Sequence, residues 1–257
     1  MESNKGKMVI GKLNMDRKAN SYPVLDDVKA VFFDCWGTLL HEKEDRRVYL
    51  KQIYDHCVNK EEVPWERAYE KASQFWDDYQ RTTHNDVRID AFVNLFCLMY
   101  DVRLDSNVEV VSSKIIDDIA GEPMDGIEDF LHELNRRHIY HGVISNTVFD
   151  GEETEKIIQQ KIPDNGFETF FFSNDYALRK PYPLIYKAAL KQAGMKKEDS
   201  IFIGDSFLDD VVGSFRFGFS KSIFLSHRPS QELLAEKDEY RDVKYIRIHS
   251  YRDLIRL

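Results

Sequence analysis

Four short polar segments carry the residues in this sequence that could do chemistry. They are Asp34-Cys-Trp-Gly-Thr38, Ser145-Asn-Thr147, Lys180-Pro181 and Gly204-Asp-Ser-Phe-Leu-Asp-Asp210. Together they supply carboxylates, a lysine, and several hydroxyl and amide groups. Carboxylates can act as nucleophiles or as ligands of a hard metal ion, and a lysine can balance the charge of an anion. Such chemistry requires that the fold bring the four segments together.

Short apolar runs precede these segments and predict buried strands. The runs cover residues 28–33, 140–145, 169–173, 200–204, 222–226 and 244–248, and helix-period segments lie between them at 126–137, 152–161, 183–193, 208–217 and 230–235. This alternation indicates repeated βαβ units, and hence an α/β fold with a parallel sheet covered on both faces. Because ligands bind beyond the carboxyl ends of such strands, we expect all four polar segments at one edge of the sheet.

One part of the chain departs from this alternation. Residues 42–119 contain no convincing strand pattern, and amphipathic helical patterns occur instead at 47–58, 64–80, 89–100 and 108–119. We therefore predict an all-helical domain inserted after the first strand. The expected organisation is an N-terminal extension at 1–26, a core formed by 27–42 and 120–257, and a helical domain at 43–119.

Composition and charge exclude several classes of protein. The 257 residues hold 36 basic and 45 acidic side chains, a formal charge of −9 that weighs against nonspecific nucleic-acid binding. No run approaches the roughly 20 apolar residues that cross a bilayer, and the first 20 residues do not resemble a secretory signal. Three cysteines without a paired pattern favour a reduced, cytoplasmic setting. We expect residues 1–22 to be a solvated tail; a nucleic-acid-binding arm is the alternative.

With these segments in place, the chain resembles the haloacid dehalogenase-like (HAD) hydrolase superfamily. The resemblance covers residues 28 to about 226 and rests on DCWGTLL, ISNT, RKPYPLIY and IFIGDSFLDDVVGSFRFGF, with the helical insert where the family carries its first-type cap. It implies a Rossmann-like core with a mobile lid. Most members of the superfamily are Mg²⁺-dependent phosphohydrolases, and a minority dehalogenate, cleave C–P bonds or transfer phosphoryl groups.

The resemblance also implies a role for each matching residue. Asp34 would be the nucleophile, and Lys180 with Mg²⁺ would bring the anionic substrate to it. The implied metal ligands are Asp34, the backbone carbonyl of Trp36 and Asp205, with Asp210 holding that shell although the adjacent Asp209 competes for this role. Thr38, Ser145 and Asn146 would bind the phosphoryl group. Each also has a structural reading, as a helix cap, a turn residue or a surface lysine.

Trp36 departs from the pattern of the phosphatases. They usually carry a second aspartate at this position, which protonates the leaving group, and an indole N–H cannot serve as an acid or base near neutral pH. Loss of a general acid typically costs about 10²–10⁴-fold in rate, so aryl and acyl phosphates should suffer less than alkyl phosphates. A residue from the cap could also supply the proton.

Three functions stay open at this point. The first is a phosphohydrolase or phosphoryl transferase that acts on a small phosphorylated metabolite. The second is a catalytically weak protein that binds a phosphorylated ligand or a protein partner, and the third is a 2-haloacid dehalogenase. Trp36 favours the last two, whereas Asp205 and Lys180 favour the first two. A monomer or a homodimer is compatible with the sequence.

Several further residues have more than one reading. Tyr186 lies where dehalogenases carry a tyrosine, but we expect it to pack in the core, as we do for Cys35. Candidates to face the site from the helical insert are Arg46, Arg47, Tyr49, His84 and Arg88, although a solvated position is the more common fate of any one of them.

Overall fold

The core is a parallel sheet. The computed structural model describes residues 22–43, 46–61 and 63–256. Within them, six strands pair in parallel in the order β10-β9-β8-β1-β6-β7. They are β1 (Ala30–Phe33), β6 (Tyr140–Ser145), β7 (Thr169–Phe172), β8 (Ser200–Gly204), β9 (Lys221–Leu225) and β10 (Ile246–Ile248). The predicted α/β class with a Rossmann-like core is confirmed.

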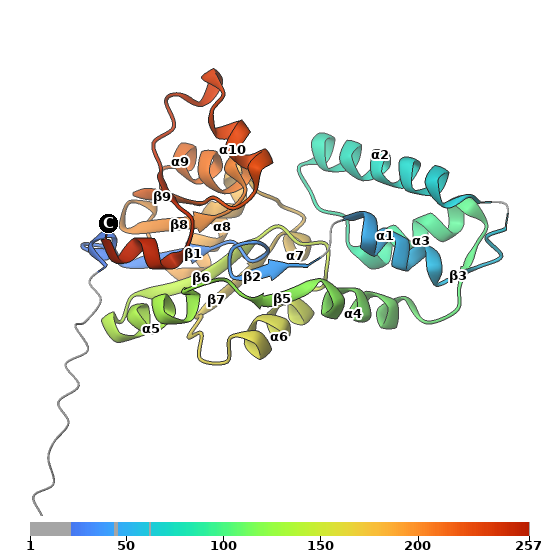
Figure 1. Cartoon of the computed structure of the whole chain (residues 1–257), viewed down its shortest axis with the longest axis horizontal. Coiled ribbons are helices and arrows are strands. Elements are labelled where there is room, and N and C mark those ends of the chain that lie inside the picture. The colour runs from blue at the N-terminus through green and yellow to red at the C-terminus, as the bar shows by residue number, and fades with distance from the viewer. Residues whose placement is uncertain (1–21, 44–45, 62, 257) are drawn as a thin grey trace, which may run out of the picture.

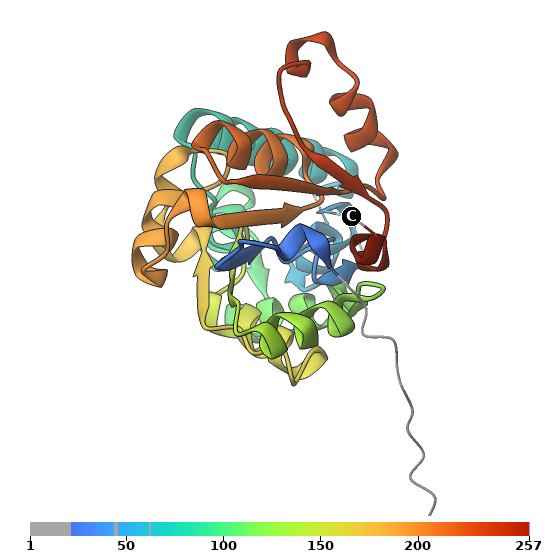
Figure 2. The same cartoon turned by 90° about the vertical axis from the view of Figure 1, so that its left-hand side faces the viewer.

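Helices cover both faces of the sheet. They are α5 (Ile127–Arg137), α6 (Gly151–Lys161), α7 (Ser173–Tyr176), α8 (Pro183–Ala193), α9 (Gly213–Phe217) and α10 (Pro229–Ala235). Val31 and Phe33 of β1 pack in the same cluster as α5 and α6, whereas Ala30 and Phe32 pack in the cluster of α8. Figure 1 shows α5 and α6 below the sheet, and in Figure 2 the strands form a layer between the green helix α5 and the orange helices. Burial on both faces explains the continuous apolar runs.

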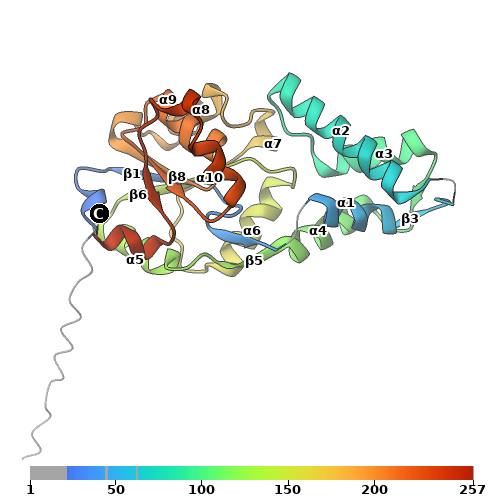
Figure 3. The same ribbon diagram turned by 45° about the horizontal axis from the view of Figure 1, so that its top comes forward.

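The helical insert lies to one side of the sheet (Figures 1 and 3). Its helices are α1 (Arg46–Asp55), α2 (Trp65–Thr83), α3 (Ile89–Tyr100) and α4 (Val108–Ile119). The antiparallel pair β2 (Leu40–Glu42) and β5 (Ala120–Pro123) joins the insert to the core. The expectation of an all-helical insert is wrong in one detail, because β3 (Cys57–Val58) and β4 (Arg103–Leu104) pair there. A two-residue strand is too short to leave a periodic signal.

Two further expectations change in detail. The helix predicted at 208–217 opens as a π-helical turn, Phe207–Val212, before α9. Tyr22, Val24 and Leu25 are buried, and the Tyr22 ring lies 5.4 Å from that of Phe130, so the core packing includes residues that we expected in the extension. The rest of the expected tail, residues 1–21, lies outside the described residues. No described helix is long and apolar enough to span a membrane.

Candidate active site

Asp34 occupies the centre of the candidate site, one residue beyond the end of β1. Its backbone N–H donates to the carbonyl of Ile203 at 2.9 Å, which continues the pairing of β1 with β8. The chain then turns at Gly37, whose φ is +74°. A Cβ on Gly37 would lie 2.5 Å from both Nη2 of Arg228 and Oδ2 of Asp205. Only glycine combines this backbone conformation with this close approach.

Lys180 links Asp34 to a second carboxylate. Its Nζ donates to Oδ1 of Asp34 and to Oδ1 of Asp210, both at 2.6 Å, and its side chain is 1 % exposed. Ser145, at the end of β6, donates to the same Oδ1 of Asp34 at 3.0 Å. The backbone N–H of Ser206 donates to the other oxygen of Asp210 at 2.9 Å. Lys180, from the loop before α8, and Ser145, at the end of β6, therefore hold Oδ1 of Asp34, and Oδ2 takes no part in these contacts.

Asp205 lies beside this pair and contacts a guanidinium. Nε of Arg228 lies 2.8 Å from its Oδ2, and the Thr38 hydroxyl donates to Oδ1 at 3.5 Å. Nε2 of His227 donates to the Gly37 carbonyl at 2.7 Å. Arg228 also forms an ion pair with Glu42 of β2 at 3.2 Å. Despite the short ion pair, no aligned hydrogen bond from a described residue reaches Oδ2 of Asp205.

The three carboxylates crowd more negative charge than their neighbours balance. Burial, opposed by Arg228, raises the pKa of Asp205 well above its usual value, and the charges of Asp34 and Asp210 add to the rise. Burial likewise raises the pKa of Asp210 to about 7 although Lys180 is adjacent. Burial would lower the pKa of Lys180, but the carboxylates outweigh it and raise the value, so the amine stays charged.

These carboxylates fit a divalent cation. One oxygen from each of Asp34, Asp205 and Asp210 lies within 4.8 Å of the others, and all three residues are buried. Mg²⁺ prefers oxygen ligands, and proteins usually bind it through one or two carboxylates while it keeps several water molecules. The buried Oδ2 of Asp205, with no aligned hydrogen bond from a described residue, supplies a further reason to assign a cation here.

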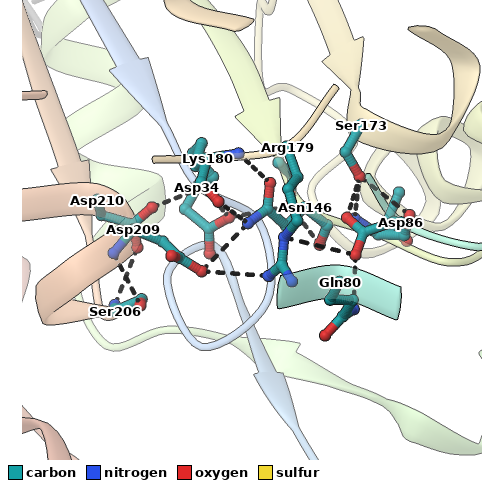
Figure 4. Close-up of polar contacts among 12 residues, drawn as sticks. Asp34, Gln80, Asp86, Asn146, Ser173, Arg179, Lys180, Ser206, Asp209 and Asp210 are labelled. Carbon is teal, nitrogen blue, oxygen red and sulfur yellow. Dashed lines mark hydrogen bonds and ion pairs between the residues drawn. The ribbon is translucent and has the colours of Figure 1, made fainter. Parts of the chain in front are cut away.

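A second polar network ties the insert to the core beside Lys180 (Figure 4). Asp86, between α2 and α3, is buried and accepts hydrogen bonds from Gln80 at 2.7 Å and from Ser173. Nε of Arg179 lies 3.6 Å from Asp86, and its Nη2 donates to Asp209 at 3.3 Å. The network leads back to the site, because Arg179 precedes Lys180 in the chain.

Asn146 fixes the loop that carries Lys180. Its Oδ1 accepts from the backbone N–H of Lys180 at 2.8 Å, and its Nδ2 donates to the Lys180 carbonyl at 3.1 Å and to Asp209 at 3.2 Å. Asn146 therefore helps to position the Lys180 amine by holding the backbone of Lys180.

A cavity of about 300 Å³ opens between these residues and the insert. Asp34, Asn146, Lys180, Asp205 and Asp210 line it from the core, as does Trp36. The edge of the sheet and the helices of the insert thus enclose one space around the candidate nucleophile.

The eight residues that the sequence predicted for the site lie close together in the structure. Some of them contact other groups than we expected. Ser145 and Thr38 are fully buried and donate to carboxylates rather than facing the cavity. Asp210, not Asp209, joins the carboxylate group. The expectations for Cys35 and Tyr186 are confirmed, since both are buried, and Tyr186 packs against Phe202 and Phe219 while its hydroxyl donates to the Asp209 carbonyl.

Of the insert candidates, only Tyr49 is among the residues that line the cavity. Arg47 pairs with Glu66, and Arg88 pairs with Asp90. The ring of His84 stacks on that of Tyr182. The side chain of Arg46 lies outside the described residues.

Arg228 and Asp86 were not expected at the site. Arg228 follows β9 at the same edge of the sheet as the other polar segments, so extending the strand-end argument to a fifth strand would have found it. Asp86 sits in a loop of the insert, and no periodicity or motif in the sequence indicates where that loop docks.

The comparison with known protein families decides the membership of the chain. A family model described as haloacid dehalogenase-like hydrolase matches residues 28–214, which is more than half of the chain. The chain belongs to the haloacid dehalogenase-like hydrolases. The carboxylate group and Lys180 of this hydrolase all lie within the matched residues.

Curated relatives match part of this hydrolase. Glyceraldehyde 3-phosphate phosphatase of Pyrococcus furiosus is 32 % identical over 104 residues, which is 39 % of this chain and 42 % of that protein. The protein of the same name from Methanothermobacter thermautotrophicus is 30 % identical over 98 residues, which is 38 % of this chain and 42 % of that protein. The chain thus matches less than half the length of these relatives.

Solved structures share its fold. A HAD phosphatase from Thermococcus onnurineus aligns with a TM-score of 0.62 and 20 % identity over 88 % of this chain and 96 % of that chain. An L-2-haloacid dehalogenase from Xanthobacter autotrophicus aligns with a TM-score of 0.57 and 14 % identity over 90 % and 98 %. The same fold therefore occurs in a phosphatase and in a dehalogenase, so the two activities have to be distinguished by the residues of the site.

Proposed function

We propose that this hydrolase is a Mg²⁺-dependent phosphohydrolase or phosphoryl transferase that acts on a small phosphorylated metabolite. The observation that carries the proposal is the buried group of Asp34, Asp205 and Asp210 around the amine of Lys180. The names of the curated relatives support a phosphatase rather than a dehalogenase. In this proposal the insert at 43–119 is the cap that selects the substrate.

Asp34 is the nucleophile of the proposed reaction. Lys180 and Ser145 hold its Oδ1, so Oδ2 attacks the phosphorus atom. The new O–P bond forms while the P–O bond to the leaving group breaks, and the leaving oxygen keeps the electron pair. Water then attacks the phosphorus atom of the phospho-aspartate, which releases inorganic phosphate and restores the carboxylate; in a transferase another hydroxyl group takes the place of water.

The surrounding residues balance charge and set positions. Asp34, Asp205 and the backbone carbonyl of Trp36 would hold Mg²⁺, which offsets the repulsion between the phosphoryl group and the carboxylates when bound. Asp210 and Asn146 keep the amine of Lys180 beside Asp34. Thr38 orients Asp205, and we propose that the exposed part of Asn146 also contacts the phosphoryl group.

Asp205 also argues against a dehalogenase. A metal-free dehalogenase has no use for this buried carboxylate, which would repel the carboxylate of a 2-haloacid. Trp36 is the one observation in favour of that activity, because its ring lines the cavity where a phosphatase would place an acid.

A substrate panel tests the proposal. Acetyl phosphate, p-nitrophenyl phosphate, sugar phosphates and 2-haloacids are assayed with Mg²⁺ and with EDTA, beside the Asp34→Asn variant. We expect turnover of phosphates that requires Mg²⁺ and is abolished in Asp34→Asn. Release of halide without turnover of any phosphate would establish the dehalogenase, and no turnover of any compound would establish the binding protein.

A further inference from the structure

The cavity above Asp34 is lined by two kinds of residue. Charged and polar residues of the core surround Asp34 and Lys180, and Gln80 and Asp86 add polar groups from the insert. The remaining lining residues are apolar or aromatic. We define this aromatic wall as Trp36, Tyr49, Trp76, Ile119, Val148 and Phe149. A phosphoryl group on Asp34 would leave the remainder of the substrate against this wall.

The rings of the aromatic wall form a connected set around Phe149. The centroid of Phe149 lies 6.2 Å from that of Trp36 and 6.4 Å from that of Tyr49, with interplanar angles of 63° and 71°. Tyr49 continues to Trp76 at 6.3 Å. The two contacts of Phe149 are edge-to-face, an arrangement that aromatic rings prefer, and the Tyr49–Trp76 pair is tilted by 52°. The core contributes Trp36 and Phe149 and the insert contributes Tyr49 and Trp76, so the wall exists only where the two parts meet.

The wall is poorly suited to a polyhydroxylated substrate. Apart from the indole N–H groups and the Tyr49 hydroxyl, its side chains are hydrocarbon. Trp36 and Val148 are half-buried, and the other four members reach the cavity only with small exposed edges, since each is at most 9 % exposed. A sugar hydroxyl placed against hydrocarbon loses its hydrogen bonds to water without replacement. Three polar lining residues, Asp86, Arg179 and Asp209, are already paired with one another.

We infer that the leaving group of the substrate is a planar aromatic ring, so that the substrate class is the aryl phosphates. This inference rests on the proposed phosphatase function and names its substrate class. A ring that packs against Tyr49 and Phe149 gains burial and ring contacts. An aryloxide is also the leaving group that least needs the acid that Trp36 replaces. The aromatic wall and the absence of an acidic side chain at position 36 thus both favour an aryl phosphate as the substrate.

Binding of phosphonates separates recognition of the ring from leaving-group chemistry, because the C–P bond leaves no ester to cleave. Calorimetry with Mg²⁺ compares methylphosphonate, phenylphosphonate, cyclohexylphosphonate and sn-glycerol 3-phosphate, with inorganic phosphate as the reference anion. The glycerol phosphate is titrated into the Asp34→Asn variant, and methylphosphonate and phenylphosphonate are repeated with that variant. We expect phenylphosphonate to bind at least tenfold tighter than methylphosphonate and cyclohexylphosphonate, and glycerol phosphate to bind no tighter than methylphosphonate.

Each of the other outcomes would overturn one part of the inference or of the proposed function. Equal affinity for all four ligands would overturn the role of the wall and leave the phosphatase proposal standing. Equal affinity for the phenyl and cyclohexyl compounds would overturn the aromatic class. No binding of any phosphonate or of inorganic phosphate would overturn the phosphatase proposal, and this inference with it.

A matched pair of variants locates the effect. Tyr49→Leu should remove most of the phenyl preference, whereas Tyr69→Leu, the same exchange in α2 outside the cavity lining, should keep it. Phe149→Leu repeats the test from the core in case Tyr49→Leu does not fold, as judged by circular dichroism. An unchanged preference in folded Tyr49→Leu and Phe149→Leu would contradict the assignment of the wall.

Discussion

Lys180 illustrates how the site holds charge at the scale of single residues. Its amine touches Asp34 and Asp210, and Asp205 lies in the same buried group. Burial raises the pKa values of Asp205 and Asp210, and the repulsion among the three carboxylates adds to the rise, although Arg228 and Lys180 oppose it. A carboxyl group whose pKa is raised by folding destabilises the folded state as the pH rises through that pKa. Without a cation, this loss of stability builds up for Asp210 as the pH rises from about 4 to about 7, and it is complete above pH 7.

Neutralising Asp205 should relieve this strain. In EDTA at pH 8 we expect Asp205→Asn to melt about 2–4 °C above the wild type, the shift for roughly 1 kcal/mol in a chain of this size. At pH 5 the difference should shrink, because the raised pKa favours the protonated, uncharged form of the wild-type carboxyl group as the pH falls. Mg²⁺ should raise the melting temperature of the wild type by mass action but not that of the variant.

Differential scanning fluorimetry checks this prediction, with Asp238→Asn as the control because Asp238 is exposed and distant from the site. If Asp205→Asn melts below the wild type in EDTA and Mg²⁺ still stabilises it, Asp205 is not a ligand of the cation.

The second prediction at the scale of single residues concerns Trp36. Trp36→Asp should raise hydrolysis of alkyl phosphates at least tenfold, which is below the 10²–10⁴-fold effect of a well-positioned acid. Trp36→Asn is the matched control, since it removes the indole and adds no acid. A similar rise in Trp36→Asn would attribute the gain to space in the cavity, and a flat dependence of the wild-type rate on the leaving group would indicate that another residue donates the proton.

At the scale of elements, the loop between α2 and α3 docks the insert on the core. The backbone N–H of Ile89 donates to Val148 at 2.8 Å, and that of Arg179 donates to His84 at 3.1 Å. Asp86 lies between these two contacts and accepts from Gln80 and Ser173. The loop therefore sets where Tyr49 and Trp76 stand relative to Asp34.

Removing the carboxylate of Asp86 should loosen this docking. Asp86→Ala leaves Arg179 and Ser173 short of a partner, which lowers the free energy of unfolding by about 1–3 kcal/mol. We expect hydrogen exchange at the amides of Ile89 and Arg179 to rise about tenfold or more, which corresponds to roughly 1.4 kcal/mol of local stability.

Asp78→Ala is the control for hydrogen exchange, because Asp78 is an exposed aspartate of α2, the helix that leads into this loop. Equal protection of the two amides in wild type and Asp86→Ala would show that the loop docks without this carboxylate.

The elements also mark what the sequence can and cannot predict. Strands buried on both faces read as apolar runs, so β6 and β8 were predictable to the residue. Because parallel strands end at a common edge, Asp34, Lys180 and Asp205 could be placed together before their distances were known. The ion pair of Arg228 with Asp205 and the docking of Asp86 depend on how loops cross the sheet edge, and loop paths leave no periodic signal.

At the scale of the whole molecule, the core and the insert contribute different parts of the candidate site. The core supplies the proposed nucleophile, the lysine and the candidate cation ligands, whereas the insert supplies half of the rings in the aromatic wall. The family match reaches residue 214, yet the curated relatives align with about two fifths of the chain. Chemistry can therefore be argued from the core, but the choice of substrate has to be tested on this chain.

Trapping the phospho-aspartate tests the central claim most directly. A rapid-quench reaction with an isotopically labelled aryl phosphate and Mg²⁺ is followed by peptide mass spectrometry. We predict transient label on the peptide that contains Asp34, sensitive to hydroxylamine and absent from Asp34→Asn. Turnover of the phosphate without label on that peptide, or turnover that persists in Asp34→Asn, would contradict the account.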